Sequence, residues 1–143
     1  MTTSRHLSRI IALEALFAFE FHGGVQNEVF DYVANEFKEK TTDFAYAKVL
    51  FDGVVEHGEK IREVIVTHAP DWPVEKIAKI DRVVLEIAIF EMNFGGDVPA
   101  VVALDEAIEL AKQYGSPNAP KFINGVLNAL LNNNRTPRES PSA

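Results

Sequence analysis

The chain has 143 residues, of which 47% are hydrophobic, and a formal net charge of −7. This length suits one domain, or at most two small halves that share a core. Cysteine is absent, which excludes disulfides, thiolate metal sites and a cysteine nucleophile. Because general nucleic-acid binders are basic, this acidic chain could bind nucleic acid only through a local patch or with a basic partner.

The N-terminal residues do not have the character of a signal peptide. Glu14 and Glu20 interrupt the apolar stretch from Ile10 to Phe21, and no small-residue cleavage site follows it. No apolar run reaches the length that spans a membrane. We therefore expect a soluble, cytoplasmic protein.

Hydrophobic periodicity predicts an all-α fold in a single domain of two halves. The N-terminal half covers about residues 4–69, and its first helix is apolar on nearly all sides, so other helices should surround it. Gly53 and Gly58 fall within the third helix, where glycine weakens helical structure, so they indicate close packing or a bend. The helices of this half are predicted at about residues 5–21, 26–40 and 44–68.

The sequence APDWP at residues 69–73 is the sharpest break and separates the two halves. We expect Trp72 to fill the core where the halves meet. The C-terminal half covers about residues 73–132, and the polar tail at 133–143 is expected to be disordered. In this half a short helix is predicted at 74–78 and longer helices at about 80–93, 98–114 and 120–132.

Gly125 lies in the middle of the last predicted helix, where glycine costs about 1 kcal/mol relative to alanine. Close approach of a neighbouring helix would explain its presence, and so would a ligand or RNA backbone lying on a bare face. We favour packing. A Gly125 that faces solvent beside Lys121 would contradict that choice.

Three basic residues, Arg5, His6 and Arg9, lie in the first turns of the first helix. Arg5 and Arg9 are four residues apart and share a face. Because the N-terminus of a helix favours acidic side chains, these arginines indicate a role outside the helix. The simpler alternative, two solvated arginines at a frayed helix end, is favoured by charge alone.

No pattern of catalytic or metal-binding residues is present. His57 and His68 would be about 16 Å apart along one helix, too far to share a metal ion. Asp105, Glu106 and Glu109 form the one carboxylate cluster, and we expect it to be a solvated helix face. Phosphate-binding glycine motifs and a nucleophile elbow are also absent from the sequence. We therefore predict no enzyme, no cofactor and no metal site.

Two blocks of the C-terminal half are the most specific features of the sequence, DEAIELAK at 105–112 and KFINGVL at 121–127, in that order and spacing. On these blocks, the sequence from Ile80 to Leu131 resembles the C-terminal half of the NusB family of bacterial transcription antitermination factors. With the first helix and the break at 71–73, the resemblance covers nearly the whole chain except the tail. Smaller matches lie at Asp81-Arg82, Leu85, 87–91, Asp97-Val98-Pro99, Arg9, Ala12 and Ala15-Leu16-Phe17.

The resemblance implies an all-α fold of two three-helix halves packed together, without catalytic activity. It also implies binding of boxA RNA, a short element of ribosomal RNA operon leaders, together with NusE, a small-subunit ribosomal protein. In that assembly RNA polymerase reads through terminators. An acidic chain suits a basic ribosomal protein as its partner.

Carried over position by position, the resemblance implies a composite RNA surface. The basic residues of the first helix would contact phosphates. Lys121 would neutralise a phosphate, and Phe122 could stack on a base, although its place on the apolar stripe predicts the core. The RNA-contacting residues would be Arg5, His6, Arg9, Phe17, Asn118, Lys121, Phe122 and Asn124. The residues contacting NusE would be Glu75, Asp81 and Arg82.

The chain departs from the family pattern in its sparse basic opening, where only Arg5 and Arg9 remain of a denser arginine run. Asn118 stands where an acidic residue is common, which would ease repulsion of phosphates. We therefore expect weak RNA binding by the chain alone and much tighter binding with NusE.

Two other functions are compatible with the sequence. One is a protein-binding adaptor with weak RNA contact. The other is a NusB-like domain cut from an RNA methyltransferase, which would need sequence beyond this chain, because it has no room for a cofactor-binding domain. Either a monomer or a homodimer fits the sequence.

Overall fold

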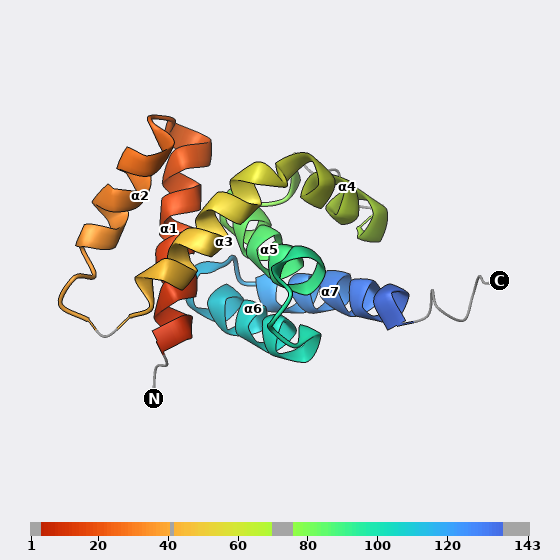
Figure 1. Ribbon diagram of the computed structural model, residues 1–143. Coiled ribbons are helices and arrows are strands. Elements are labelled where there is room, and N and C mark those ends of the chain that lie inside the picture. The colour runs from red at the N-terminus through yellow and green to blue at the C-terminus, as the bar shows by residue number, and fades with distance from the viewer. Residues whose placement is uncertain (1–3, 41, 70–75, 136–143) are drawn as a thin grey trace.

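The computed structural model describes residues 4–40, 42–69 and 76–135, which are helical over most of their length and contain no strand (Figure 1). The all-α prediction is therefore confirmed for the described residues. Trp72, the proposed core plug, lies outside them, as do the first two residues of the predicted helix at 74–78 and most of the polar tail. Of the described remainder of that predicted helix, only Lys76 has helical (3-10) backbone. The elements are α1 (Ser4–His22), α2 (Gln26–Asn35), α3 (Phe44–Glu56), α4 (Gly58–His68), α5 (Lys79–Phe90), the π-helical turn η2 (Glu91–Gly95), α6 (Ala100–Tyr114) and α7 (Ala119–Arg135).

The third predicted helix is two helices, because the chain bends at His57 between α3 and α4. The His57 ring stacks on Phe94 of η2, with 4.4 Å between ring centroids. Gly58 starts the new helix, and no atom lies within 4 Å of the Cβ that an alanine would place there. Gly53, in contrast, packs directly under the ring of Phe90. The two glycines thus have different roles, Gly58 at a bend and Gly53 at a close contact.

Helix α1 is buried or half-buried from His6 to Phe21, as its apolar character predicts. It packs against α2, α3 and α5. Its most buried apolar residues are Ile11, Ala12, Leu13, Ala15 and Leu16.

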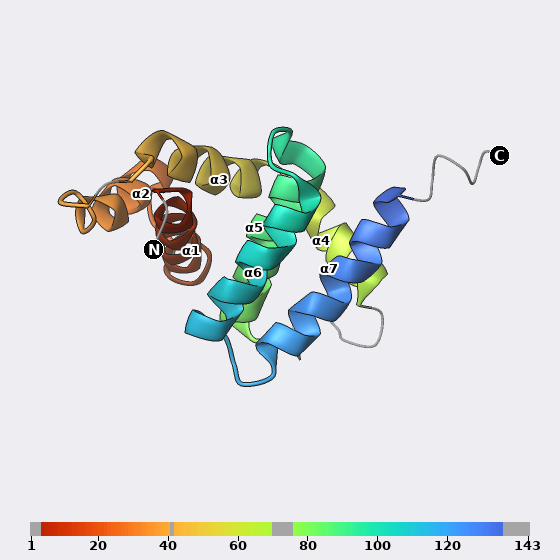
Figure 2. The ribbon, with the colours of Figure 1, turned by 90° about the horizontal axis from the view of Figure 1, so that it is seen from below.

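Helix α5 is the centre of the molecule and contacts α1, α3, α4, α6 and α7. Figure 2 shows it behind α6 and between the N-terminal helices and α7. Helix α4 belongs to the N-terminal half by sequence, but it packs mainly on α5 and α7. His68 at its end lies 2.7 Å from the side-chain nitrogen of Asn133. No helix among the described residues is long and apolar enough to cross a membrane.

Candidate functional site

Arg9 is a buried cation. Its side chain is only 4% exposed, and its Nε and Nη2 donate hydrogen bonds to the carboxylate of Glu91 at 2.9–3.2 Å. Its Nη1 lies 3.4 Å from Glu106. Burial opposes the charge of Arg9, but the hydrogen bond and charge of Glu91, followed by the charge of Glu106, raise the pKa of Arg9 above its usual value. Neither the expected phosphate contact nor a solvated arginine fits this placement, since both require an exposed guanidinium.

Tyr46 of α3 completes the surroundings of this buried ion pair. Its hydroxyl donates a short hydrogen bond to Glu91, which is 1% exposed. Burial, followed by the hydrogen bond and charge of Glu91, raises the pKa of the Tyr46 hydroxyl well above its usual value. Glu91 therefore accepts from both Arg9 and Tyr46, which joins α1, α3 and the start of η2 beneath the surface.

Arg5 remains at the surface. Its side chain is 41% exposed, its guanidinium carbon lies 3.8 Å from the centroid of the Tyr46 ring, and Nη2 is 3.7 Å from Asp97. An exposed pair at that distance contributes little to stability. Arg5 can therefore exchange Asp97 for another anion.

His6 points toward α6 instead of outward. Its Nδ1 lies 2.9 Å from Glu106 and its Nε2 3.2 Å from Gln113. Glu106 thus contacts both His6 and Arg9. The prediction of a solvated carboxylate face on α6 fits Asp105 and Glu109, which are exposed, but not Glu106.

Phe17 lies apart from this cluster. It is half-buried near the other end of α1, with its ring centroid 5.2 Å from that of Phe21. Twelve residues of helix place it about 18 Å along the axis from Arg5. The structure therefore does not bring Phe17 into the basic cluster.

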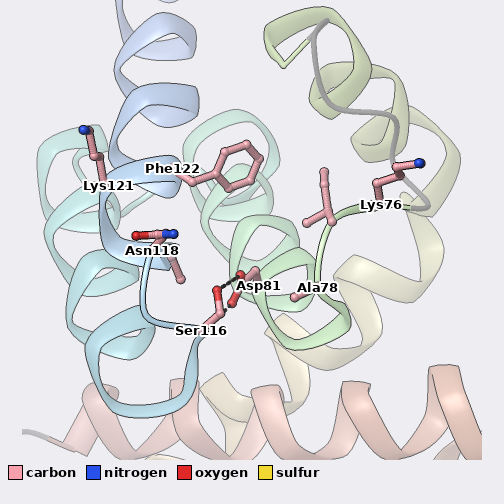
Figure 3. Close-up of a pocket in the computed structure, with 9 residues that line it drawn as sticks. Lys76, Ala78, Asp81, Ser116, Asn118, Lys121 and Phe122 are labelled. Atoms are coloured by element: carbon pink, nitrogen blue, oxygen red, sulfur yellow. Dashed lines mark hydrogen bonds between the residues drawn. The ribbon is translucent and has the colours of Figure 1, made fainter.

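A second group of predicted residues surrounds a hollow of about 580 Å³ between the starts of α5 and α7 (Figure 3). The Phe122 ring points from α7 toward the segment that carries Lys76, whereas Lys121 lies on the other side of the first turn of α7. Lys121 and Asn118 are exposed and Phe122 is half-buried. The hollow is lined by Lys76, Ile77, Ala78, Asp81, Ser116, Asn118, Ala119, Lys121 and Phe122.

Asp81 lies in this hollow but is directed inward. It is 4% exposed and accepts hydrogen bonds from the backbone N–H of Ser116 at 3.2 Å and from its hydroxyl at 2.8 Å. These bonds hold the loop between α6 and α7 against α5. The carboxylate expected to contact NusE is therefore already engaged within the chain.

Arg82 is similarly occupied by its own chain. Its Nη2 lies 3.3 Å from Glu20, and its Nε 3.6 Å from Glu86. Burial, followed by the hydrogen bond and charge of Glu20, raises the pKa of Glu86 well above its usual value. Glu75, the third expected NusE contact, lies outside the described residues.

The outer face of α7 continues away from the hollow. Asn124 is exposed, and its backbone and side-chain oxygens accept hydrogen bonds from Asn128 at 3.0 and 2.8 Å. Gly125 is exposed beside them, and no atom lies within 4 Å of the Cβ it lacks. The prediction that Gly125 serves packing is therefore wrong. Gly125 instead leaves a stretch of helix surface without a side chain, one turn beyond Lys121.

We expect Gly125→Ala to increase the free energy of unfolding by about 1 kcal/mol, because the methyl group meets nothing and the helix gains propensity. Urea denaturation measures this. The matched reverse variant, Ala129→Gly at the next exposed turn, should destabilise by a similar amount. A destabilised Gly125→Ala protein would contradict the open face.

Sequence reasoning missed Tyr46, Glu91 and Glu106 as partners of the basic residues. The usable signal was Glu91, an acid that directly follows the apolar run IAIF at 87–90. A carboxylate buried at such a position needs a cationic partner. Among the described residues, no group of three or more histidines and acids is placed to hold a metal ion.

Comparisons with known proteins agree over nearly the whole chain. The sequence model of the NusB family matches residues 6–132. The transcription antitermination protein NusB of Bacillus subtilis is 40% identical over 123 residues, covering 86% of this chain and 91% of that protein. NusB of Dehalococcoides mccartyi (strain CBDB1) is 39% identical over 130 residues, covering 91% of each chain.

Solved structures with the same fold include a complex with RNA. T. maritima NusB superposes with a TM-score of 0.80 at 32% identity and covers 92% of this chain and 93% of that one. A chain from the complex of antitermination factors NusB and NusE with dsRNA superposes with a TM-score of 0.82 at 28% identity, covering 93% of this chain and 99% of that one.

Proposed function

The chain belongs to the NusB family, and from that premise we propose that it is a transcription antitermination factor that binds boxA-type RNA together with NusE. In this role it has no catalytic activity and works in the cytoplasm, within the antitermination complex of RNA polymerase. The observation that carries the proposal is the likeness to the NusB–NusE complex with dsRNA over 93% of the chain.

We propose that the RNA-binding surface consists of the exposed polar groups at two places. Arg5 and Lys121 supply positive charge for phosphates. Asn118 and Asn124 present amides that can hydrogen-bond to sugars or bases, and the half-buried Phe122 can offer part of its ring for stacking. Arg9 takes no direct part, because Glu91 and Glu106 surround its guanidinium. His6 and Phe17 would act only at the margins of this surface.

We propose that NusE binds near the hollow, with Glu75, Asp81 and Arg82 as its expected contacts. Asp81 lines the hollow, and Arg82 would have to exchange Glu20 or Glu86 for a group of the partner. A ribosomal protein is expected to be basic, so the net charge of −7 favours its approach.

Two exposed cations in an acidic protein give a weak electrostatic contribution to RNA binding. A titration of boxA RNA at fixed salt should therefore show weak binding by the chain alone and binding at least about tenfold tighter when NusE is present. Equal affinities in the two titrations would contradict this expectation.

The same titration distinguishes an RNA-binding factor from the alternative, a protein-binding adaptor with weak RNA contact. An adaptor would bind NusE, measured by calorimetry, while the complex showed no more affinity for boxA RNA than NusE alone. A scrambled RNA of the same length and composition is the control for non-specific binding.

A further inference from the structure

The guanidinium of Arg5 is supported by an aromatic ring of α3. Its guanidinium carbon lies over the Tyr46 ring, 3.8 Å from the ring centroid. A ring below a guanidinium covers its face but leaves the N–H donors, which lie in the guanidinium plane, available to an anion. The stacked Arg5 can therefore still donate to a phosphate.

Tyr46 is itself fixed in place at both ends. Its backbone N–H donates to the carboxylate of Asp43 at 3.0 Å, the N-cap of α3. Its hydroxyl donates to the buried Glu91, which Arg9 holds from α1. Tyr46 is only 8% exposed, so neighbouring atoms surround most of its side chain.

The start of α1 is tied to the same place by a second contact. The hydroxyl of Ser8 donates to the backbone oxygen of Asp43 at 2.7 Å, next to the cap that holds Tyr46. The backbone that carries Arg5 and the ring that supports its side chain are thus fastened to one another. This arrangement limits the positions that the guanidinium can adopt.

We propose that Tyr46 is a positioning residue for RNA binding, whose ring holds the guanidinium of Arg5 where it meets a phosphate. The inference rests on the proposed RNA-binding function. A free arginine side chain loses rotamer entropy when it binds a phosphate, whereas a stacked one has already lost much of it. The exposed Asp97, at 3.7 Å, is displaced when the phosphate arrives.

The test is a double-mutant cycle on boxA RNA binding by the complex with NusE, measured over a series of salt concentrations. Arg5→Ala should weaken binding about tenfold and reduce the slope of log K against log salt by about 0.7, one phosphate contact on a single strand. Tyr46→Leu should weaken binding by a smaller factor, because the guanidinium remains but is no longer held in place. The double variant should be no weaker than Arg5→Ala alone, because the ring acts on RNA only through Arg5.

Conservative variants separate positioning from a merely structural role. Tyr46→Phe keeps the ring and should restore binding to within about twofold of wild type, although it loses the bond to Glu91. Arg5→Lys keeps the charge but not the planar group, so it should bind RNA about threefold more weakly. Tyr32→Leu, at an exposed tyrosine of α2, is the matched control and should change nothing.

Additive effects of Tyr46→Leu and Arg5→Ala, or full affinity in Arg5→Lys, would overturn the inference. Because Arg5→Lys changes only an exposed side chain, it gives a result even if Tyr46→Leu does not fold. Failure of the proposed function looks different, since the wild-type complex would then show no specific binding of boxA RNA at all.

Discussion

Replacing Glu91 with alanine should lower the free energy of unfolding by about 3–5 kcal/mol, because it leaves a buried arginine without its counter-charge. Glu91 is 1% exposed and receives the hydrogen bonds of both Arg9 and Tyr46. Only Glu106, at 3.4 Å from Arg9, would remain nearby. Urea denaturation followed by circular dichroism measures the loss.

Asp105→Ala is the matched control, since Asp105 is an exposed carboxylate of α6 and its removal should change the stability little. A triple variant, Arg9→Met/Tyr46→Phe/Glu91→Leu, replaces the whole polar group with apolar side chains and should be more stable than Glu91→Ala. If Glu91→Ala were as stable as Asp105→Ala, the hydrogen bonds of Arg9 and Tyr46 to Glu91 would not stabilise the fold as the structure indicates.

A methyl group on Gly53 should also destabilise the protein, by about 1–3 kcal/mol or more, through overpacking. The added Cβ would lie 2.2 Å from Cε1 of Phe90, a distance that atoms cannot adopt. Phe90 is buried between α3 and η2, with His57 and Phe94 beside it, so its ring has little space to move. Thermal or urea denaturation of Gly53→Ala measures this effect.

Gly58→Ala is the natural comparison, because it makes the same substitution five residues later with no atom within 4 Å. A second comparison adds Phe90→Leu to Gly53→Ala, which shortens the obstructing side chain and should recover part of the loss. Equal stability of Gly53→Ala and Gly58→Ala would show that the contact with Phe90 does not restrict this position.

Local sequence pattern was sufficient to predict most of the helices, but the predicted helix at 26–40 ends at Asn35, the one at 44–68 is two helices, and the contacts between helices could not be predicted. The apolar surroundings of α1 and the helical spacing of α5 to α7 follow from residue type and period. The bend at His57 has no proline to signal it, and Gly58 indicated either a bend or close packing without deciding between them, so α3 and α4 were predicted as one helix. Where α4 lies depends on contacts with α5 and α7.

The two mid-helix glycines show why packing could not be assigned from sequence. Gly53 and Gly125 have the same local signal, a glycine inside a predicted helix. Gly53 meets Phe90, 37 positions away, whereas Gly125 faces open space. The neighbour that decides between these roles is distant in the chain, so periodicity carries no information about it.

The same reasoning applies to the candidate site. Arg5 and Arg9 share a helix face at a spacing of four residues, but Arg9 finds Glu91 and Glu106 inside the protein while Arg5 stays outside. Asn118, Lys121 and Phe122, which the resemblance implied as RNA contacts, lie with Asp81 around one hollow. They do so because Asp81 of α5 holds the loop after α6 through Ser116.

The central claim is that Arg5 of α1 and Lys121 of α7 contribute to one RNA-binding surface. The most direct test is the salt dependence of boxA RNA affinity for the NusE complex, in wild type and in Arg5→Ala/Lys121→Ala. We expect the double variant to bind NusE normally, to bind RNA at least about tenfold more weakly, and to lose about 1.4 from the slope of log K against log salt, as for two phosphate contacts. An unchanged affinity and slope would contradict the claim.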